Sequence, residues 1–191
     1  MRIIKASELG ESIREKLCEL YINSFYEDGL KTFAKDKTKL YKAWNHTFIL
    51  DNFFVATIED DIAGMIGFMR KDGYCMKLSL FKFIRYLGLF WGAIAYIMVK
   101  KDLKESHKIH EDSLMIEFLG VSENHRKKGV ATALFHKIFT ELDYQSYVLK
   151  VADNNNLAFE LYKKLGFIET HRVKFMPSSG ISYWIHLKYT K

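Results

Sequence analysis

The stretch from Leu114 to Ile138 constrains the fold of this chain more than any other part of the sequence. It begins with an apolar run (LMIEFLGV), continues through a short basic segment (SENHRKKG) and ends in VATALFHKI. In the last segment Val130, Leu134 and Ile138 recur every four residues, which is the spacing of one helix face. The stretch therefore predicts a strand, a tight turn and an amphipathic helix in direct succession.

The turn of this unit, Arg126-x-x-Gly129-x-Ala131, has the chemistry of an anion site. Small residues let the backbone close tightly, the first amides of a helix have no partner inside it, and the helix dipole adds partial positive charge. Arg126, Lys127 and Lys128 add three full charges. Such a turn favours a phosphate or pyrophosphate, whereas an ordinary strand–helix junction is the alternative for this fragment alone.

A second strand–turn–helix unit runs from Val148 to Phe167. Asn154 and Asn155 stand where a helix cap is expected, and Gly166 stands where the helix should end. The residues expected on one face of this helix are Leu157, Ala158, Leu161, Tyr162 and Leu165.

The spacing Asn155-x-x-Ala158-x-x-Leu161-Tyr162-x-Lys164-x-Gly166-Phe167, joined to the first unit, resembles the general N-acetyltransferase (GNAT) superfamily, which binds acetyl-coenzyme A. The resemblance covers most of the chain except Gly73 to about Glu111. It implies an α/β (α+β) fold with a mixed, mostly antiparallel twisted sheet of six to seven strands and about four flanking helices. We expect one domain over residues 1–191, with residues 73–112 as an apolar helical insertion between the third and fourth strands.

The insertion contains a dense apolar and aromatic run from Leu78 to Val99. The uncharged run from Tyr86 to Val99 is only fourteen residues long, whereas a membrane span takes about 20. A buried or cleft-lining helical hairpin is the first expectation and a membrane-surface helix the second. We expect Lys100 to Asp112 to return to the sheet exposed to solvent. The cations that would lie near lipid headgroups are Lys82, Arg85, Lys100 and Lys101.

The remaining elements follow from periodicity and turn residues. Helices are expected from Ser7 to Phe25 and, loosely packed on the surface, from Lys31 to Thr47. Gly64 and Gly67 in one strand would allow close approach of substrate or backbone. The expected strands are Ile3–Ile4, Phe53–Ile58, Ile62–Met69, Phe167–Phe175 and Ile181–Tyr189, with turns at Glu59–Asp61 and Pro177–Gly180.

The resemblance also implies where the coenzyme lies. The central strand and the next one splay apart, and the pantetheine arm bonds to free strand-edge backbone at Leu119 and Val121. Glu123 stands where many members have proline and Ala131 replaces the last glycine, but neither change removes a needed amide. The residues expected to bind acetyl-CoA are Leu119, Val121, Arg126, Lys127, Lys128, Gly129, Val130, Ala131, Thr132, Asn155, Ala158 and Tyr162.

Two residues are expected to carry the chemistry. Tyr162 matches the position that commonly protonates the leaving thiolate, and a core aromatic is the alternative. Glu117 is the lone charge in an apolar strand, and the two-residue period puts it on one face with Leu119 and Val121. Partial desolvation would raise its pKa toward the range of a general base, although a structural carboxylate is an equal alternative.

Composition restricts the partners only mildly. The 29 basic and 23 acidic side chains give a net charge of +6, which suits coenzyme A, nucleic acid or an anionic membrane. Nucleic acid is not expected, because the basic residues flank a glycine turn and do not interleave with aromatics. Cys18 and Cys75 are too few for a disulfide framework, which favours a cytoplasmic location, and His107-x-x-His110 has no further ligand, so no metal is expected.

The sequence as a whole predicts an acetyl-CoA-dependent N-acetyltransferase that acts by direct transfer in a ternary complex. The acceptor would be a small-molecule or peptide amine, and the protein a monomer or homodimer. The alternatives are a non-catalytic coenzyme A sensor or scaffold, and a membrane-surface protein anchored by the insertion.

Overall fold

A computed structural model describes residues 1–59, 61–175 and 180–191. The strands in these residues are β1 (Arg2–Lys5), β2 (Phe53–Ile58), β3 (Asp61–Met69), β4 (Ser113–Val121), β5 (Ser146–Ala152), β6 (Ile168–Lys174) and β7 (Tyr183–Thr190). The α-helices are α1 (Ile13–Phe25), α2 (Lys37–Trp44), α3 (Leu80–Leu87), α4 (Leu89–Ser106), α5 (Val130–Glu141) and α6 (Asn156–Lys164).

The strands form one sheet in the order β1-β2-β3-β4-β5-β7-β6. Every neighbouring pair is antiparallel except β4 and β5, which are parallel. Four helices (α1, α2, α5 and α6) flank this sheet, and α3 and α4 lie between β3 and β4 in the chain. The expected fold, including the apolar helical insertion between the third and fourth strands, is confirmed.

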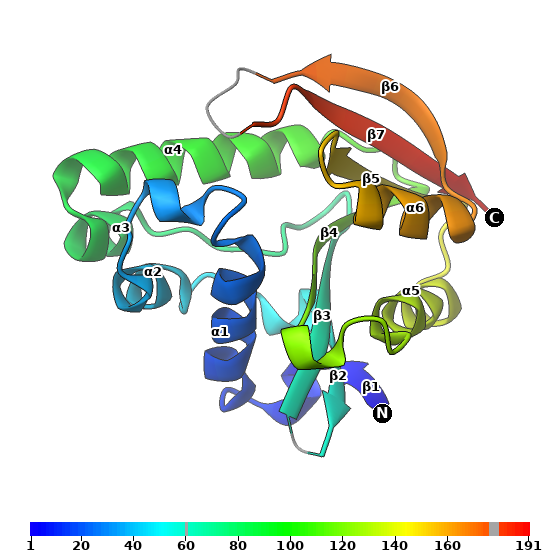
Figure 1. Ribbon diagram of the computed structural model, residues 1–191, viewed down its shortest axis with the longest axis horizontal. Coiled ribbons are helices and arrows are strands. Elements are labelled where there is room, and N and C mark those ends of the chain that lie inside the picture. Colours follow the sequence, from blue (N-terminus) through cyan, green and yellow to red (C-terminus); the bar gives the residue numbers. More distant parts are fainter. Residues whose placement is uncertain (60, 176–179) are drawn as a thin grey trace.

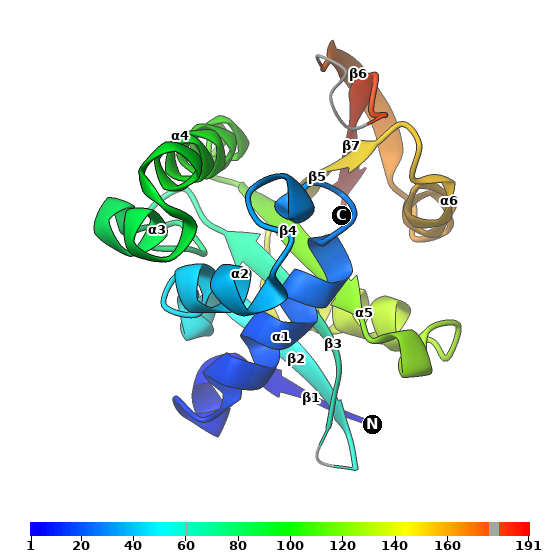
Figure 2. The same ribbon diagram turned by 60° about the vertical axis from the view of Figure 1, so that its left-hand side comes forward.

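Two apolar cores form on opposite faces of the sheet. Helices α1 to α4 cover one face, and α5 and α6 cover the other (Figure 1 and Figure 2). The first core is centred on Leu17, Trp44 and Met65, and the second on Leu134, Phe135 and Tyr147. The two sequence motifs contain α5 and α6. Both helices therefore contribute side chains to the second core, on the same face of the sheet.

The insertion is a helical pair broken at Gly88, whose φ of 83° ends α3 and begins α4. Its inner face is buried through Phe83, Ala95 and Leu103. The expected exposed return from Lys100 to Asp112 is confirmed for most of its residues, but α4 continues to Ser106, and Leu103 and Ser106 are buried. Leu103 and Ser106 extend the buried stripe by further helical turns. No helix in the described residues is long and apolar enough to cross a membrane.

The N-terminal helices are shorter than the sequence suggests. The first begins at Ile13 and not at Ser7, because residues Ala6–Leu9 form a 3₁₀ turn and Gly10 has a positive φ, which a continuous α-helix does not allow. The second begins after Asp36, whose side chain accepts a hydrogen bond from the Thr38 amide at 2.8 Å. This helix is not loosely packed, since Leu40 and Trp44 are fully buried.

The predicted turns fall partly outside the described residues: Asp60 in the first turn, and Pro177, Ser178 and Ser179 in the second, belong to the segments that the structure does not describe.

At Gly92, α4 lies directly against the backbone of α3. A Cβ added there would lie 2.6 Å from the backbone N and Cα of Ile84 and from the carbonyl carbon of Phe83. Because these neighbours are backbone atoms, they cannot move aside without separating the two helices.

We therefore expect Gly92→Ala to destabilise the protein by about 1–3 kcal/mol, although glycine to alanine inside a helix normally stabilises. Urea unfolding measures the difference, with Gly73→Ala as the control, since a Cβ at Gly73 would meet nothing within 4 Å. A stabilised Gly92→Ala variant would contradict the tight α3–α4 contact.

Candidate functional site

The site begins where β4 and β5 separate. These strands pair only at their first residues, Ser113 with Ser146, Leu114 with Tyr147 and Met115 with Val148. The Ser113 and Ser146 hydroxyls share a 2.8 Å hydrogen bond at this closed end. Beyond Met115 no described residue of β5 pairs with β4, so one edge of β4 is left open from residue 116 to 121. Such an edge can bind an extended ligand through main-chain hydrogen bonds.

A β-bulge in β4 decides which side chains face which core. Phe118 has a φ of 52°, and the register with β3 shifts between Met65 and Gly67. Leu119 and Val121 consequently pack in the core under α5 and α6, whereas Phe118 packs in the core under α1 to α4. The predicted shared face of Glu117 with Leu119 and Val121 is therefore wrong, because the extra residue reverses the alternation between them.

The basic turn lies between β4 and α5 and has the predicted form. Lys127 and Gly129 both have positive φ, of 60° and 77°, and Gly129 is the N-cap of α5. The first hydrogen bond of α5 runs from the Ala133 amide to the Gly129 carbonyl, at 3.0 Å. The three helical amides before Ala133 therefore have no acceptor inside the helix. These amides belong to Val130, Ala131 and Thr132.

The three cations of this turn are not equivalent. Arg126 donates from Nε to the Val121 carbonyl at 3.4 Å and lies 3.7 Å from the Glu123 carboxylate, so it is partly used within the turn. Lys127 and Lys128 are exposed and make no ion pair with any described residue. Their charge is therefore free to act on an anion at the helix N-terminus.

Gly64 on β3 brings this turn against the sheet. A Cβ at Gly64 would lie 2.7 Å from Cγ1 of Val130, and one at Gly67 would lie 2.8 Å from the Phe53 ring. The close approach predicted at these two glycines is thus made by neighbouring side chains. At Gly64 it sets the first turn of α5 directly on β3.

The second motif forms as predicted, with one exception. The Asn155 side chain accepts a hydrogen bond from the Ala158 amide at 3.1 Å and caps α6, so both groups are already engaged with each other. Leu157 is 83% exposed and does not join the buried face expected for it, because it lies in the first turn of α6, outside the contact with α5.

Tyr162 is buried between α6 and α5. Its ring centroid lies 5.6 Å from that of Phe135 and 6.0 Å from that of Phe167. Burial raises the pKa of its phenol above the ordinary value, and the carboxylate of Glu117 raises it further. Glu117 therefore acts electrostatically on Tyr162 although Glu117 lies on β4 near the side chains of α4, whereas Tyr162 lies on α6 on the other face of the sheet.

Glu117 is buried, at 7% exposure, and its Oε1 has no hydrogen-bond partner among the described residues. Burial raises the pKa of this carboxyl group; the Lys150 ammonium lowers it, the Asp102 carboxylate raises it and the Ser106 hydroxyl lowers it, with a net increase. A carboxylate with an unused oxygen and a raised pKa has the properties of a general base.

Sequence reasoning missed the partners of Glu117. Lys150 on β5 forms an ion pair with Asp102 of α4 and donates to the Ser106 hydroxyl at 2.9 Å. Burial by itself lowers the pKa of Lys150, but the carboxylates of Glu117 and Asp102 outweigh this effect, so the pKa is raised. Lys150 could have been identified from the sequence, because it is the one charged residue in an apolar strand. The same criterion identified Glu117.

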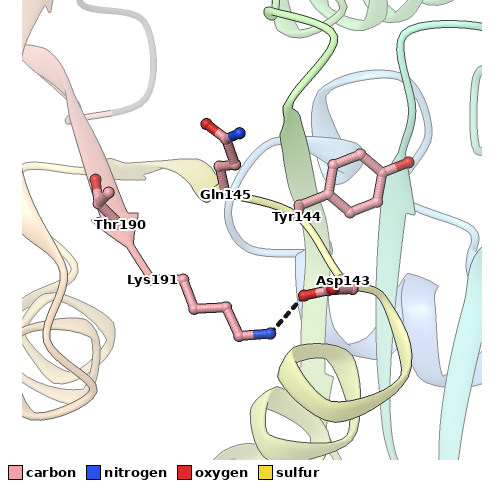
Figure 3. Close-up of a pocket in the computed structure, with 5 residues that line it drawn as sticks. All are labelled: Asp143, Tyr144, Gln145, Thr190 and Lys191. Atoms are coloured by element: carbon pink, nitrogen blue, oxygen red, sulfur yellow. Dashed lines mark hydrogen bonds and ion pairs between the residues drawn. The ribbon is translucent and has the colours of Figure 1, made fainter.

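An open hollow elsewhere contains none of the candidate site residues. It has a volume of about 380 Å³ and is lined by the segment after α5 and the end of β7 (Figure 3). Asp143 and Lys191 form an ion pair across it, and Tyr144, Gln145 and Thr190 complete the lining. It lies at the closed end of the β4–β5 pair and is separate from the open edge.

The comparisons with known proteins agree with the fold. Residues 14–167 match the model of the acetyltransferase (GNAT) family. The fold is similar to that of an N-acetyltransferase from Staphylococcus aureus Mu50, with a TM-score of 0.65 and 17% identity over 99% of this chain and 100% of that one. It is also similar to smu.2055 from Streptococcus mutans UA159, with a TM-score of 0.62 and 22% identity over 100% of this chain and 99% of that one.

A ribosomal-protein-alanine N-acetyltransferase from Brucella melitensis gives a TM-score of 0.59 and 11% identity over the full length of both chains. No curated protein matches the sequence. These structural likenesses show the fold, and the family match extends over both motifs and the strands between which the coenzyme is expected. The chain belongs to the GNAT acetyltransferase family, whose members use acetyl-CoA.

Proposed function

We propose that this acetyltransferase moves the acetyl group of acetyl-CoA to a primary amine by direct transfer within a ternary complex. The observation that carries the proposal is the buried Glu117 carboxyl group, with one oxygen that has no described partner, on the strand whose edge β5 leaves open; the buried Tyr162 phenol, whose pKa Glu117 raises, lies on α6, which follows β5. One group can remove a proton from an amine, and the other can donate one to the leaving sulfur.

The residues near this edge suit the coenzyme. The diphosphate fits the amides of Val130, Ala131 and Thr132, which have no acceptor inside α5, with charge from Lys127 and Lys128. The pantetheine amides fit the β4 edge at Leu119 and Val121, which β5 leaves free; there the Val121 carbonyl also accepts a hydrogen bond from Arg126 Nε at 3.4 Å. When bound, acetyl-CoA supplies the acetyl group and a thiolate leaving group. Asn155 and Ala158 already bond to each other, so they would act by holding the start of α6.

Glu117 is the proposed general base. Its free Oε1 can accept a proton, and its raised pKa lies closer to neutrality than that of an exposed glutamate. Lys150 stabilises the ionised form that the reaction requires, because its ammonium lowers the pKa of Glu117.

Tyr162 is the proposed donor to the leaving thiolate. Its raised pKa keeps the phenol protonated throughout the physiological range, so a hydrogen bond to the sulfur is always available. The same shift makes complete ionisation of the phenol costly. Because the thiol of coenzyme A leaves with the donated proton, Tyr162 takes up a new proton from solvent, and Glu117 releases to solvent the proton that it removed from the amine.

Direct transfer is favoured over an acetyl-cysteine step because both cysteines are buried. Burial raises the pKa of Cys18 to about 12, and it also raises that of Cys75 well above the ordinary value. Since the thiolate is the nucleophilic form, neither sulfur is suited to accept an acetyl group.

Lys127→Gln together with Lys128→Gln should weaken acetyl-CoA binding about 3- to 10-fold, an effect that shrinks at high salt because exposed charges are screened. Isothermal titration calorimetry measures the Kd. Lys39→Gln with Lys42→Gln on the exposed side of α2 is the charge-matched control. The absence of saturable binding to the folded wild type would overturn the proposed site.

The rate should fall as the pH drops through the raised pKa of Glu117, because only the carboxylate can act as a base. This acid limb should disappear in Glu117→Gln. It should move to higher pH in Lys150→Met, which removes a charge that lowers this pKa, and to lower pH in Asp102→Asn, which removes one that raises it. A kcat/KM pH profile measures the limb; identical profiles in all variants would assign Glu117 a structural role.

Tyr162→Phe should lower kcat about 100-fold with little change in the KM for acetyl-CoA, the range of a lost proton donor. A thiol-release assay across a panel of small and peptide amines measures this, with Tyr183→Phe on exposed β7 as the control. A folded wild type that binds acetyl-CoA tightly but releases thiol with no amine would favour a coenzyme A sensor.

A further inference from the structure

The insertion presents large apolar side chains to solvent although its inner face is buried. Leu89 is 75% exposed, Phe81 70%, Phe90 67% and Ile97 61%. Such side chains are normally buried, and a contiguous apolar surface marks an interaction site. The further exposed members are Leu80, Trp91 and Met98.

On α4 these residues form one outward stripe. Phe90, Ile97 and Met98 recur at positions i, i+7 and i+8, which places them on one helix face; Ile94, on the same side, is partly buried against the first core. The opposite face, with Gly92, Ala95 and Leu103, packs inward. The turn between α3 and α4 lies at one extremity of the molecule, at the left of Figure 1, far from β6 and the C-terminus.

The charge around this surface has a single sign. Residues 73–101 contain five basic side chains and no acidic one. Within the described chain none of the five forms an ion pair, and the side chains of Lys82 and Arg85 are exposed on α3 beside Phe81. The five are Lys77, Lys82, Arg85, Lys100 and Lys101.

The exposed apolar side chains and the positive charge together indicate which kind of partner could bind this surface. A second copy of the chain would bring cations against cations, which opposes self-association through this face. An anionic lipid surface offers both an apolar layer for the aromatic side chains and negative headgroups for the cations. Trp91 at the helix start is the residue type that favours the boundary between water and lipid.

We propose that the outer face of the α3–α4 hairpin docks on an anionic phospholipid bilayer, lying in the plane of the interface. Phe81, Phe90 and Trp91 would enter the headgroup region, and Lys82 and Arg85 would contact lipid phosphates. The inference is independent of the acetyl-transfer proposal, because none of these residues belongs to the site at the β4 edge.

Vesicle flotation of the full chain tests this proposal. The wild type should float with phosphatidylcholine vesicles that contain about 30% phosphatidylserine, and float at least about fivefold less with pure phosphatidylcholine or at high salt. Phe81→Ser with Phe90→Ser should reduce flotation about tenfold or more through lost apolar burial. Lys82→Gln with Arg85→Gln should reduce it several-fold on the anionic vesicles alone.

The matched control is Ile168→Ser with Val173→Ser, which removes two exposed apolar side chains from β6 at the other end of the molecule. It should float like the wild type. The proposal is overturned if the wild type does not float, if the control loses as much as the hairpin variant, or if light scattering shows a dimer that the hairpin variant abolishes. Circular dichroism and wild-type binding of acetyl-CoA confirm that each variant is folded.

Discussion

The divergence of β4 from β5 after Met115 is the constraint on which the candidate site depends. Parallel neighbours in a sheet normally share a continuous ladder, and main-chain groups left without partners inside a protein cost free energy. An open edge in the middle of a sheet is therefore stable where water or a ligand satisfies it. The hydrogen bond between Ser113 and Ser146 closes one end of the pair, so the opening is directed toward the basic turn.

The bulge at Phe118 divides the parts of the site between the two faces of the sheet. The turn that suits a diphosphate and the ring of Tyr162 lie with α5 and α6, whereas Glu117 faces α4. A buried carboxylate needs compensation, because removing a charge from water is costly unless a counter-charge lies near. Lys150 supplies that charge, and Asp102 and Ser106 hold its ammonium.

The insertion consequently has two roles set by the two sides of one helix. The inward side of α4 carries Asp102 and Ser106 to the buried charges next to β4, so it is part of the wall of the site. The outward side of its first half carries Phe90 and Ile97 into solvent. Helical periodicity allows both, since residues three or four apart share a face while their neighbours point away.

The sequence by itself determined the strand–turn–helix units, the apolar helical insertion, and the basic turn at Gly129. These are local patterns, in which apolar period, glycine and charge lie within a few residues of one another. Only the tertiary structure decided the face of Glu117, its pairing with Lys150 and Asp102, and the exposure of Phe81 and Phe90. A one-residue bulge reverses side-chain alternation without a clear mark in the sequence, and contacts between residues 48 positions apart arise only when the insertion packs against the sheet.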